Sequence, residues 1–304
     1  MSKNVLITGG SGMVGRHLSK RLMSSGFNVS WLGRSSNAPE GITGYKWDID
    51  SNYIDKGALA NADYVVHLAG EGIADKRWTS QQRQKIIDSR VKSAALLKKG
   101  IENSTAHIKA FISASGAGYY GYDTGITPLT EEAPAGNDFV AEVVKKWEKA
   151  ADSFGDLGLR VVKLRIGIVL SSKGGALGKI TTPIKWGVGS PLGSGKQAVS
   201  WIHIDDLCGV IEHAITNDVM DGVYNTASPQ CINNHKLTKT IAKVIHRPLL
   251  LPNVPSIALK MIFGELANLI LGGQNLATEK LQDTGYQFEY DAIESALSHL
   301  LKTK

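Results

Sequence analysis

The chain of 304 residues contains only two cysteines, Cys208 and Cys231. Two cysteines cannot build a disulfide framework, and neither belongs to a cluster with metal-ligand spacing, so we expect no bound metal. Reduced thiols and a cytoplasmic location are therefore expected. The sequence runs directly into a strand pattern without a signal peptide, which also does not favour export.

Long hydrophobic runs are missing as well. The longest, residues 256–271, is shorter than the ~20 residues needed to span a bilayer, and Lys260, Glu265 and Asn268 interrupt it. We expect no membrane partner and predict a buried or dimer-forming helix there. Lys and Arg number 34 against 28 Asp and Glu, but basic and aromatic residues are not interleaved. Nucleic-acid binding is therefore only a weak alternative and no nucleic-acid partner is expected, while an anionic cofactor or substrate explains the excess of basic residues equally well.

Strand and helix patterns alternate along the first half of the chain. With 42% hydrophobic residues, the chain can bury a large core. The alternation predicts an α/β fold, a Rossmann-type doubly wound parallel sheet with a smaller C-terminal substrate domain. Further strands are expected at residues 28–32, 45–49, 62–70, 109–113 and 160–170, and helices at 14–25, 79–99 and 138–154.

The most informative motif is VLITGGSGMVG at residues 5–15, where an apolar strand enters a glycine-rich turn before a helix. Gly9 permits the sharp turn, Gly12 lets backbone N–H groups approach a pyrophosphate, and Gly15 allows close packing of the helix. The helix N-terminus then faces the phosphates. The predicted cofactor contacts in this turn are Gly9, Gly10, Ser11, Gly12, Met13, Val14 and Gly15.

The ends of the next strands indicate which dinucleotide is bound. The second strand ends in Gly33-Arg34-Ser35-Ser36 rather than in the carboxylate that commonly binds the ribose of NAD. Arg34 and Ser35 can instead bind a 2′-phosphate, which favours NADP(H). The alternative is that Arg34 is a solvated surface charge. Asp48 is predicted either to accept a hydrogen bond from the adenine amino group or to serve only a turn.

Two later strand ends are expected beside the nicotinamide. Leu68, Ala69 and Gly70 are small or apolar and let a cofactor approach the backbone. The segment SASGAGYYG, residues 113–121, offers hydroxyl groups, of which Ser115, Tyr119 and Tyr120 are the catalytic candidates.

The second half of the chain contains glycine-rich loops at residues 174–178 and 187–195, which suit either a substrate lid or a structural loop. His203 is predicted to be structural, with a substrate contact as the alternative. Residues 200–206 read as a strand followed by an aspartate-capped helix. We predict a cofactor domain at 1–170, to which 200–245 returns, and a substrate-side domain at 171–199 and 246–304.

Several motifs together resemble the extended type of the short-chain dehydrogenase/reductase superfamily. Within it, the chain is most similar to the atypical epimerase family, sometimes labelled cell-division inhibitors or nucleoside-diphosphate-sugar epimerases. The motifs are ITGGSGMVG, HLAGEGIADKRW, the Ser89-Arg90 pair, SASGAGYYG, the Trp147-Glu148 pair, GSGKQAVSWIHIDD and PNVPSIALKMIFGELANLILGGQ. The resemblance covers nearly the whole chain and implies bound NADP(H) beneath a smaller C-terminal domain.

The same resemblance exposes a departure. Active members use a tyrosine and, four residues later, a lysine, but counting back from Glu148 places Val140 and Val144 there. The usual serine aligns with Gly116, one residue from Ser115, and Arg90 replaces an asparagine.

Two functions remain open. The chain is either an NADP(H)-dependent oxidoreductase or epimerase with a relocated acid/base group, or an inactive NADP(H)-binding sensor or scaffold. In the enzyme, Ser115 orients a hydroxyl of a small-molecule substrate and Tyr119 or Tyr120 exchanges the proton of that hydroxyl. Arg90 supplies the positive charge that the absent lysine would otherwise provide. Packing is the alternative for each tyrosine. We favour the enzyme, with a sugar nucleotide as the substrate by analogy only. Helices 79–99 and 138–154 could form a homodimer interface, as in relatives.

Overall fold

A computed structural model describes residues 3–302 of the chain. Within these residues the central sheet has eight strands in the order β13-β8-β6-β5-β1-β2-β3-β4. All neighbouring strands are parallel except β3 and β4. The strands are β1 (Asn4–Thr8), β2 (Asn28–Gly33), β3 (Thr43–Asp48), β4 (Tyr53–Ile54), β5 (Tyr64–His67), β6 (Ala110–Gly116), β8 (Arg160–Ile166) and β13 (Gly222–Thr226).

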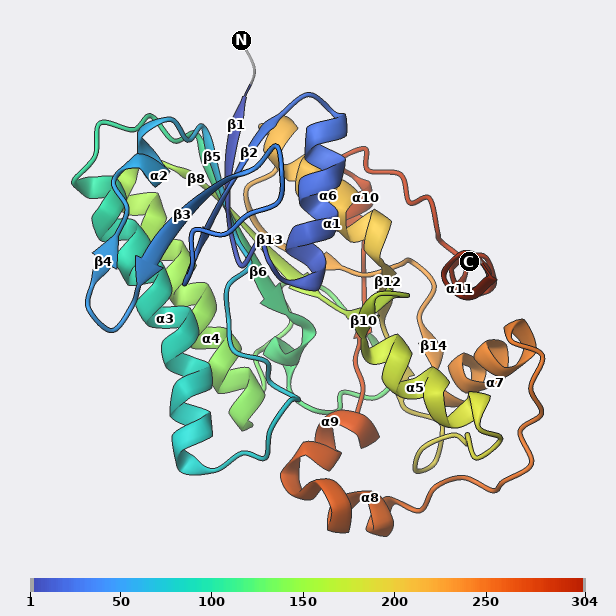
Figure 1. The fold of residues 1–304 in the computed structure, drawn as a ribbon. Helices are drawn as coiled ribbons and strands as arrows, with labels where there is room; N and C mark the ends of the chain where they lie inside the picture. The colour runs from blue at the N-terminus through green and yellow to red at the C-terminus, as the bar shows by residue number, and fades with distance from the viewer. Residues whose placement is uncertain (1–2, 303–304) are drawn as a thin grey trace.

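Helices cover both faces of this sheet (Figure 1). Along β1, Val5 and Ile7 pack into the core shared with α1 (Met13–Ser24) and α6 (Ile204–Thr216), whereas Leu6 packs on the other side. That second side is covered by α2 (Gly57–Ala60), α3 (Ser80–Glu102) and α4 (Phe139–Asp152). A strand buried on both faces reads as a continuous apolar run, as β1 does. The doubly wound sheet predicted from the sequence is confirmed.

The long strand predicted at residues 160–170 is wrong, because the chain changes sheets at Gly167. Gly167 N donates to Thr226 O, but Ile168 N donates to Ser200 O. A Cβ atom on Gly167 would lie 2.5 Å from Ser200 O, so only glycine fits this crossing. The continuation, β9 (Ile168–Ser171), joins β10 (Gly174–Gly175) and β12 (Trp201–His203) in a second sheet.

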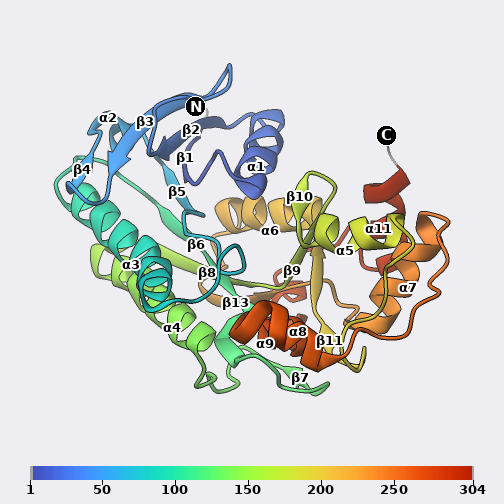
Figure 2. The same ribbon diagram turned by 60° about the horizontal axis from the view of Figure 1, so that its bottom comes forward.

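The second lobe is assembled from separated parts of the chain. Figure 2 shows its helices gathered on one side of the central sheet. Its elements are α5 (Ala176–Lys185), β11 (Ala198–Val199), β14 (Ile232–Asn233), α7 (Asn234–Val244), α8 (Ser256–Phe263), η3 (Gly264–Leu266), α9 (Ala267–Leu271) and α11 (Ile293–Lys302). The intervening β15 (Asn275–Leu276) pairs with β7 (Pro128–Leu129), and α10 (Glu279–Gln282) follows it.

Two predicted helix ends differ from the structure. The helix predicted at 79–99 continues as α3 through Gly100 to Glu102. A Cβ atom on Gly100 would lie 2.8 Å from Leu59 Cδ1, so this glycine allows close packing instead of ending the helix. Helix α6 is capped not by an aspartate but by His203, whose side chain accepts from Asp205 N.

The apolar run at 256–271 is not one buried helix. It breaks after α8 at Gly264, whose φ of +58° lies in the left-handed region that favours glycine. Leu259 is buried on α8, whereas Ile257 and Met261 are 71% and 73% exposed. The predicted burial is therefore wrong for most of α8. No helix among residues 3–302 is long and apolar enough to cross a bilayer.

Candidate functional site

The glycine turn between β1 and α1 has the backbone of an anion cradle. Gly9 has a φ of +71°, and its carbonyl accepts from Gly12 N at 3.0 Å. A Cβ atom on Gly15 would lie 2.5 Å from Gly9 O, so α1 packs directly on the turn. Gly12 caps α1 without a side-chain hydrogen bond. The first N–H groups of α1 are therefore left without a side-chain cap and can bind an anionic group.

The other residues of the turn are held by its neighbours. Ser11 O accepts from Arg16 Nε at 2.7 Å. Met13 lies against the Gly174–Gly175 turn of the second sheet, and Val14 packs against the core. A Cβ atom on Gly10 would lie 2.4 Å from the Trp31 ring, which is itself buried at the end of β2. The Trp31 ring, Arg16 and the neighbouring Gly174–Gly175 segment thus hold the turn in place.

The predicted 2′-phosphate and adenine contacts lie at the ends of β2 and β3. Arg34 is exposed immediately after Gly33. The hydroxyl of Ser35 accepts from Asn37 N at 3.1 Å. Asp48 Oδ1 accepts from Asp50 N at 3.0 Å, and hydrogen bonds from Ser51 hold the pKa of Asp48 below its usual range. Asp48 therefore stabilises the turn that follows β3, one of its two predicted roles, while a contact with the adenine stays a prediction.

A buried polar chain missed at the sequence level positions the 68–70 segment. The Thr8 hydroxyl accepts from Ala69 N at 3.2 Å and shares a hydrogen bond of 2.8 Å with His67 Nδ1. The other ring nitrogen, Nε2, lies 3.2 Å from Ser93 Oγ. Burial, and secondarily the charge of Arg90, lowers the pKa of His67 to about 3. A neutral histidine therefore joins β1, β5 and α3 directly beneath the expected cofactor position.

Arg90 brings a positive charge behind this segment. Its Nη1 donates to Glu71 O and Ile86 O, each at 3.0 Å, and its guanidinium lies 4.7 Å from the centre of the Trp147 ring. A Cβ atom on Gly70 would lie 3.1 Å from Arg90 Cζ, so the guanidinium packs against the Gly70 backbone.

Within residues 3–302 Arg90 forms no ion pair with a carboxylate, although the more distant charge of Glu71 acts on it, and its Nε has no hydrogen-bond partner there. Burial lowers the pKa of Arg90 to about 10, so it remains charged at neutral pH.

Ser115 takes part in a buried ion-pair network that the sequence did not reveal. Its hydroxyl donates to Glu148 Oε1 at 2.6 Å. Arg165 binds the same carboxylate through Nε at 2.8 Å and Nη2 at 2.9 Å. All three side chains are buried. Because its proton is committed to Glu148, Ser115 can offer only lone pairs to another group.

The two tyrosines differ in their surroundings. Tyr120 is buried, and its hydroxyl accepts from Arg165 Nη1 at 2.9 Å and donates to Asn225 Oδ1 at 2.7 Å. Burial raises the pKa of Tyr120 above its usual range. Tyr119 is only half-buried, with the Arg165 guanidinium 3.4 Å from its ring centre. Within residues 3–302 its hydroxyl makes no protein hydrogen bond. Tyr119 is therefore the tyrosine that has a hydroxyl to offer.

Val140 and Val144, at the positions expected for the tyrosine and lysine, are both buried on α4. They pack against the turn that follows β6. A Cβ atom on Gly118 would lie 2.3 Å from Val140 Cγ1 and 3.9 Å from Val144 Cγ2. Apolar packing has thus replaced the usual acid/base pair, and α4 contributes the Glu148 carboxylate one turn later.

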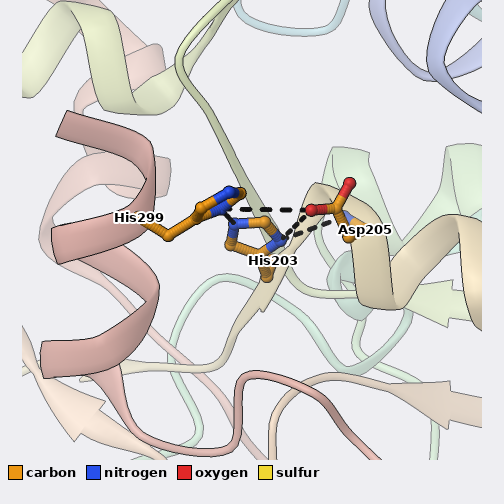
Figure 3. A group of neighbouring side chains, drawn as sticks. All are labelled: His203, Asp205 and His299. Atoms are coloured by element: carbon orange, nitrogen blue, oxygen red, sulfur yellow. Dashed lines mark hydrogen bonds and ion pairs between the residues drawn. The ribbon is translucent and has the colours of Figure 1, made fainter. Parts of the chain in front are cut away.

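His203 lies away from this network, in a group with Asp205 and His299 (Figure 3). One donor atom from each of the three lies within 4.8 Å of the others, a spacing that can suit a metal ion. However, His203 Nδ1 accepts from Asp205 N at 3.0 Å, which places the ring proton on Nε2, 3.1 Å from His299 Nδ1. Burial lowers the pKa of His203 to about 4, so the ring is neutral at pH 7. The predicted structural role fits this geometry, because the ring caps α6 and connects it to α11.

Comparison with known sequence families gives two matches. The profile of the NAD dependent epimerase/dehydratase family matches residues 5–227. That of a domain of unknown function (DUF1731) matches residues 254–300. An epimerase family protein from Staphylococcus saprophyticus is 36% identical over 304 residues, which cover 98% of this chain and 99% of the relative.

Solved structures agree with this assignment. The crystal structure of a human epimerase family protein with NADPH has a TM-score of 0.88 and 31% identity, and the match covers 99% of this chain and all of that one. A nucleoside-diphosphate sugar epimerase from Corynebacterium glutamicum has a TM-score of 0.80 and 33% identity, covering 99% of this chain and 58% of that chain. The similarity therefore extends over both lobes.

Proposed function

The chain belongs to the NAD dependent epimerase/dehydratase family, and from this we propose that it is an NADP(H)-dependent oxidoreductase or epimerase. The observation that carries the proposal is the uncapped α1 N-terminus at the glycine turn, followed by the exposed Arg34 after β2. The human relative crystallised with NADPH supports the choice of dinucleotide. When bound, the nicotinamide supplies or accepts a hydride.

The residues present fit this cofactor. The α1 N–H groups would hold the pyrophosphate, and the Arg34 guanidinium with the Ser35 hydroxyl would bind the 2′-phosphate. Asp48 would lie near the adenine. Leu68, Ala69 and Gly70 would line the cofactor, with the Arg90 charge behind Gly70 replacing part of the charge of the missing lysine.

We assign the chemistry to Ser115 and Tyr119. Because the Ser115 hydroxyl donates to Glu148, its lone pairs would accept a hydrogen bond from a substrate hydroxyl and so orient the substrate. Tyr119, with no intramolecular bond to its hydroxyl, would then exchange the proton, assisted by the neighbouring Arg165 cation. Tyr120 keeps its place in the buried network. Arg90 acts electrostatically and touches no substrate.

We assign the substrate domain to residues 171–199 and 246–304, against which β14 and α7 of the second lobe pack. The C. glutamicum relative is named a nucleoside-diphosphate sugar epimerase, which makes a sugar nucleotide the first substrate class to test. We also propose a cytoplasmic protein that dimerises through α3 and α4.

We expect Tyr119→Phe to lower kcat by about 10²-fold or more, the usual contribution of a positioned acid or base. The assay mixes the protein with NADPH and a panel of sugar nucleotides and simpler carbonyl compounds, and follows nicotinamide absorbance. Tyr120→Phe should lower the free energy of unfolding but leave kcat within a few-fold. Tyr53→Phe, an exposed tyrosine on β4, is the matched control and should change neither quantity.

Unchanged kcat in Tyr119→Phe would remove this tyrosine from the mechanism. A protein that binds NADPH but oxidises it with no compound of the panel would favour the second function, an NADP(H)-dependent sensor or scaffold. The specific observation behind that alternative is the packed valine pair, Val140 and Val144, where active relatives carry tyrosine and lysine.

A further inference from the structure

The basic excess of the chain resides entirely in the second lobe. Residues 171–199 and 231–264 together contain nine Lys and Arg residues and no Asp or Glu. The rest of the chain has 25 basic and 28 acidic residues and is slightly acidic. The nine basic residues are Lys173, Lys179, Lys185, Lys196, Lys236, Lys239, Lys243, Arg247 and Lys260. These two segments therefore carry a net positive charge, although Lys179 pairs with Asp75 and Lys236 pairs with Glu294.

The same two segments expose large apolar side chains. Trp186 and Val188 follow the end of α5, Leu250 and Leu251 lie between α7 and α8, and Ile257 and Met261 share one side of α8. Trp186 is 80% exposed and Leu250 77% exposed. A group of large exposed apolar side chains on two neighbouring segments is a candidate interaction surface. We call these six residues, with the lysines around them, the basic apolar face.

Backbone contacts hold the two segments side by side. The 188–192 stretch runs next to the 251–254 stretch: Val254 N donates to Pro191 O and Gly193 N donates to Val254 O, each at 2.9 Å. Ser190 Oγ donates to Pro252 O at 2.5 Å. Helix α8 begins two residues after Val254. Figure 2 shows α5, α7 and α8 on the same side of the molecule.

We propose that the basic apolar face binds the surface of an anionic lipid bilayer. In the chain, Lys185 directly precedes Trp186 and Lys260 directly precedes Met261. Exposed apolar side chains next to lysines are typical of peripheral membrane contacts, in which the apolar side chains enter the interface and the lysines meet the head groups. Exposed tryptophan also prefers the membrane interface.

The composition argues against other anionic partners. Eight of the nine cations are lysine and one is Arg247, whereas protein interfaces favour arginine and are depleted in lysine. Single-stranded nucleic acid is usually bound by several stacking aromatic residues, whereas the two segments expose only Trp186 and, less fully, Phe263 among their large aromatic side chains in the described part of the chain.

The test is sedimentation of the full chain with lipid vesicles. We expect binding to vesicles of phosphatidylglycerol and phosphatidylcholine, little binding to phosphatidylcholine alone, and a loss of binding as salt rises. The double variant Trp186→Ser/Met261→Ser should reduce the vesicle-bound fraction at least fivefold, as should Lys185→Gln/Lys260→Gln. Ile126→Ser and Val219→Ser remove equally exposed side chains elsewhere and should bind like the unmodified protein.

The proposal is overturned if the unmodified protein does not sediment with anionic vesicles, or if the two control variants weaken binding as much as Trp186→Ser/Met261→Ser. Light scattering during gel filtration measures the molar mass of the protein and shows whether the face is instead covered by a second copy of the chain. A dimer that this double variant dissociates, together with absent vesicle binding, would show that a second copy of the chain covers the face.

Discussion

Gly15→Ala is expected to lower the affinity for NADPH at least 100-fold, which is about 2.8 kcal/mol at 1.4 kcal/mol per factor of ten. An added Cβ atom would lie 2.5 to 2.7 Å from Gly9 O, Gly10 Cα and Gly10 O. These are backbone atoms and cannot rotate away, so α1 must move off the turn or the turn must change shape. Either movement takes the N–H groups of α1 out of line with the phosphates.

Fluorescence titration with NADPH measures this effect, with circular dichroism to establish that the variant is folded. Gly155→Ala is the matched control, because no atom lies within 4 Å of its added Cβ, and its affinity should be unchanged. A folded Gly15→Ala protein with nearly unchanged affinity for NADPH would contradict the proposal that the glycine turn and the N–H groups of α1 bind the cofactor phosphates. If that variant does not fold, Gly12→Ala replaces it, because its Cβ would be 3.2 Å from Gly9 O and a smaller loss of affinity is expected.

Arg165→Met is expected to lower the free energy of unfolding by about 3–5 kcal/mol, as for other buried ion pairs that lose one partner. The variant leaves the Glu148 carboxylate buried without its two guanidinium hydrogen bonds. It also removes the donors to the Tyr120 hydroxyl and to Glu131 O.

Urea unfolding measures the change. Lys146→Met is the control, since it breaks an exposed i,i+4 pair with Glu142 and should cost about 0.5 kcal/mol or less. The double variant Arg165→Met/Glu148→Gln should regain part of the lost stability, because the uncompensated charge is gone. A loss below about 1 kcal/mol in Arg165→Met would mean that Glu148 finds another partner and that the network does not hold Ser115 in place.

The central sheet could be predicted from the sequence because its signals are local. The apolar run before Gly9 and the helical spacing after Gly12 both depend on neighbouring residues, and α1 and α4 begin and end within a residue or two of the predicted bounds. The same reasoning failed at Gly167, where apolar strand residues continue on both sides. Only the partner strand changes there, and a partner strand has no signature in the strand's own sequence.

The candidate site could be predicted only where backbone shape decides it. The glycine turn is encoded in adjacent residues, whereas Ser115, Glu148, Arg165 and Asn225 lie far apart in sequence and meet only in the folded chain. In the same way, nothing near His203 indicates that its ring caps α6 and meets His299 on the last helix. The burial predicted for the C-terminal run was wrong because α8 keeps one apolar side exposed and the chain then turns at Gly264; a dimer contact through this helix stays a prediction.

The central claim is that the chain binds NADP(H) through the glycine turn and Arg34. The most direct test is a pair of fluorescence titrations, with NADPH and with NADH, on the unmodified protein and on Arg34→Ala. Arg247→Ala, another exposed arginine, serves as the control. We predict preferential binding of NADPH, a Kd for NADPH raised about tenfold in Arg34→Ala, the size of one charge-assisted hydrogen bond, and an unchanged Kd for NADH. Equal binding of both nucleotides, unaffected by Arg34→Ala, would contradict the account.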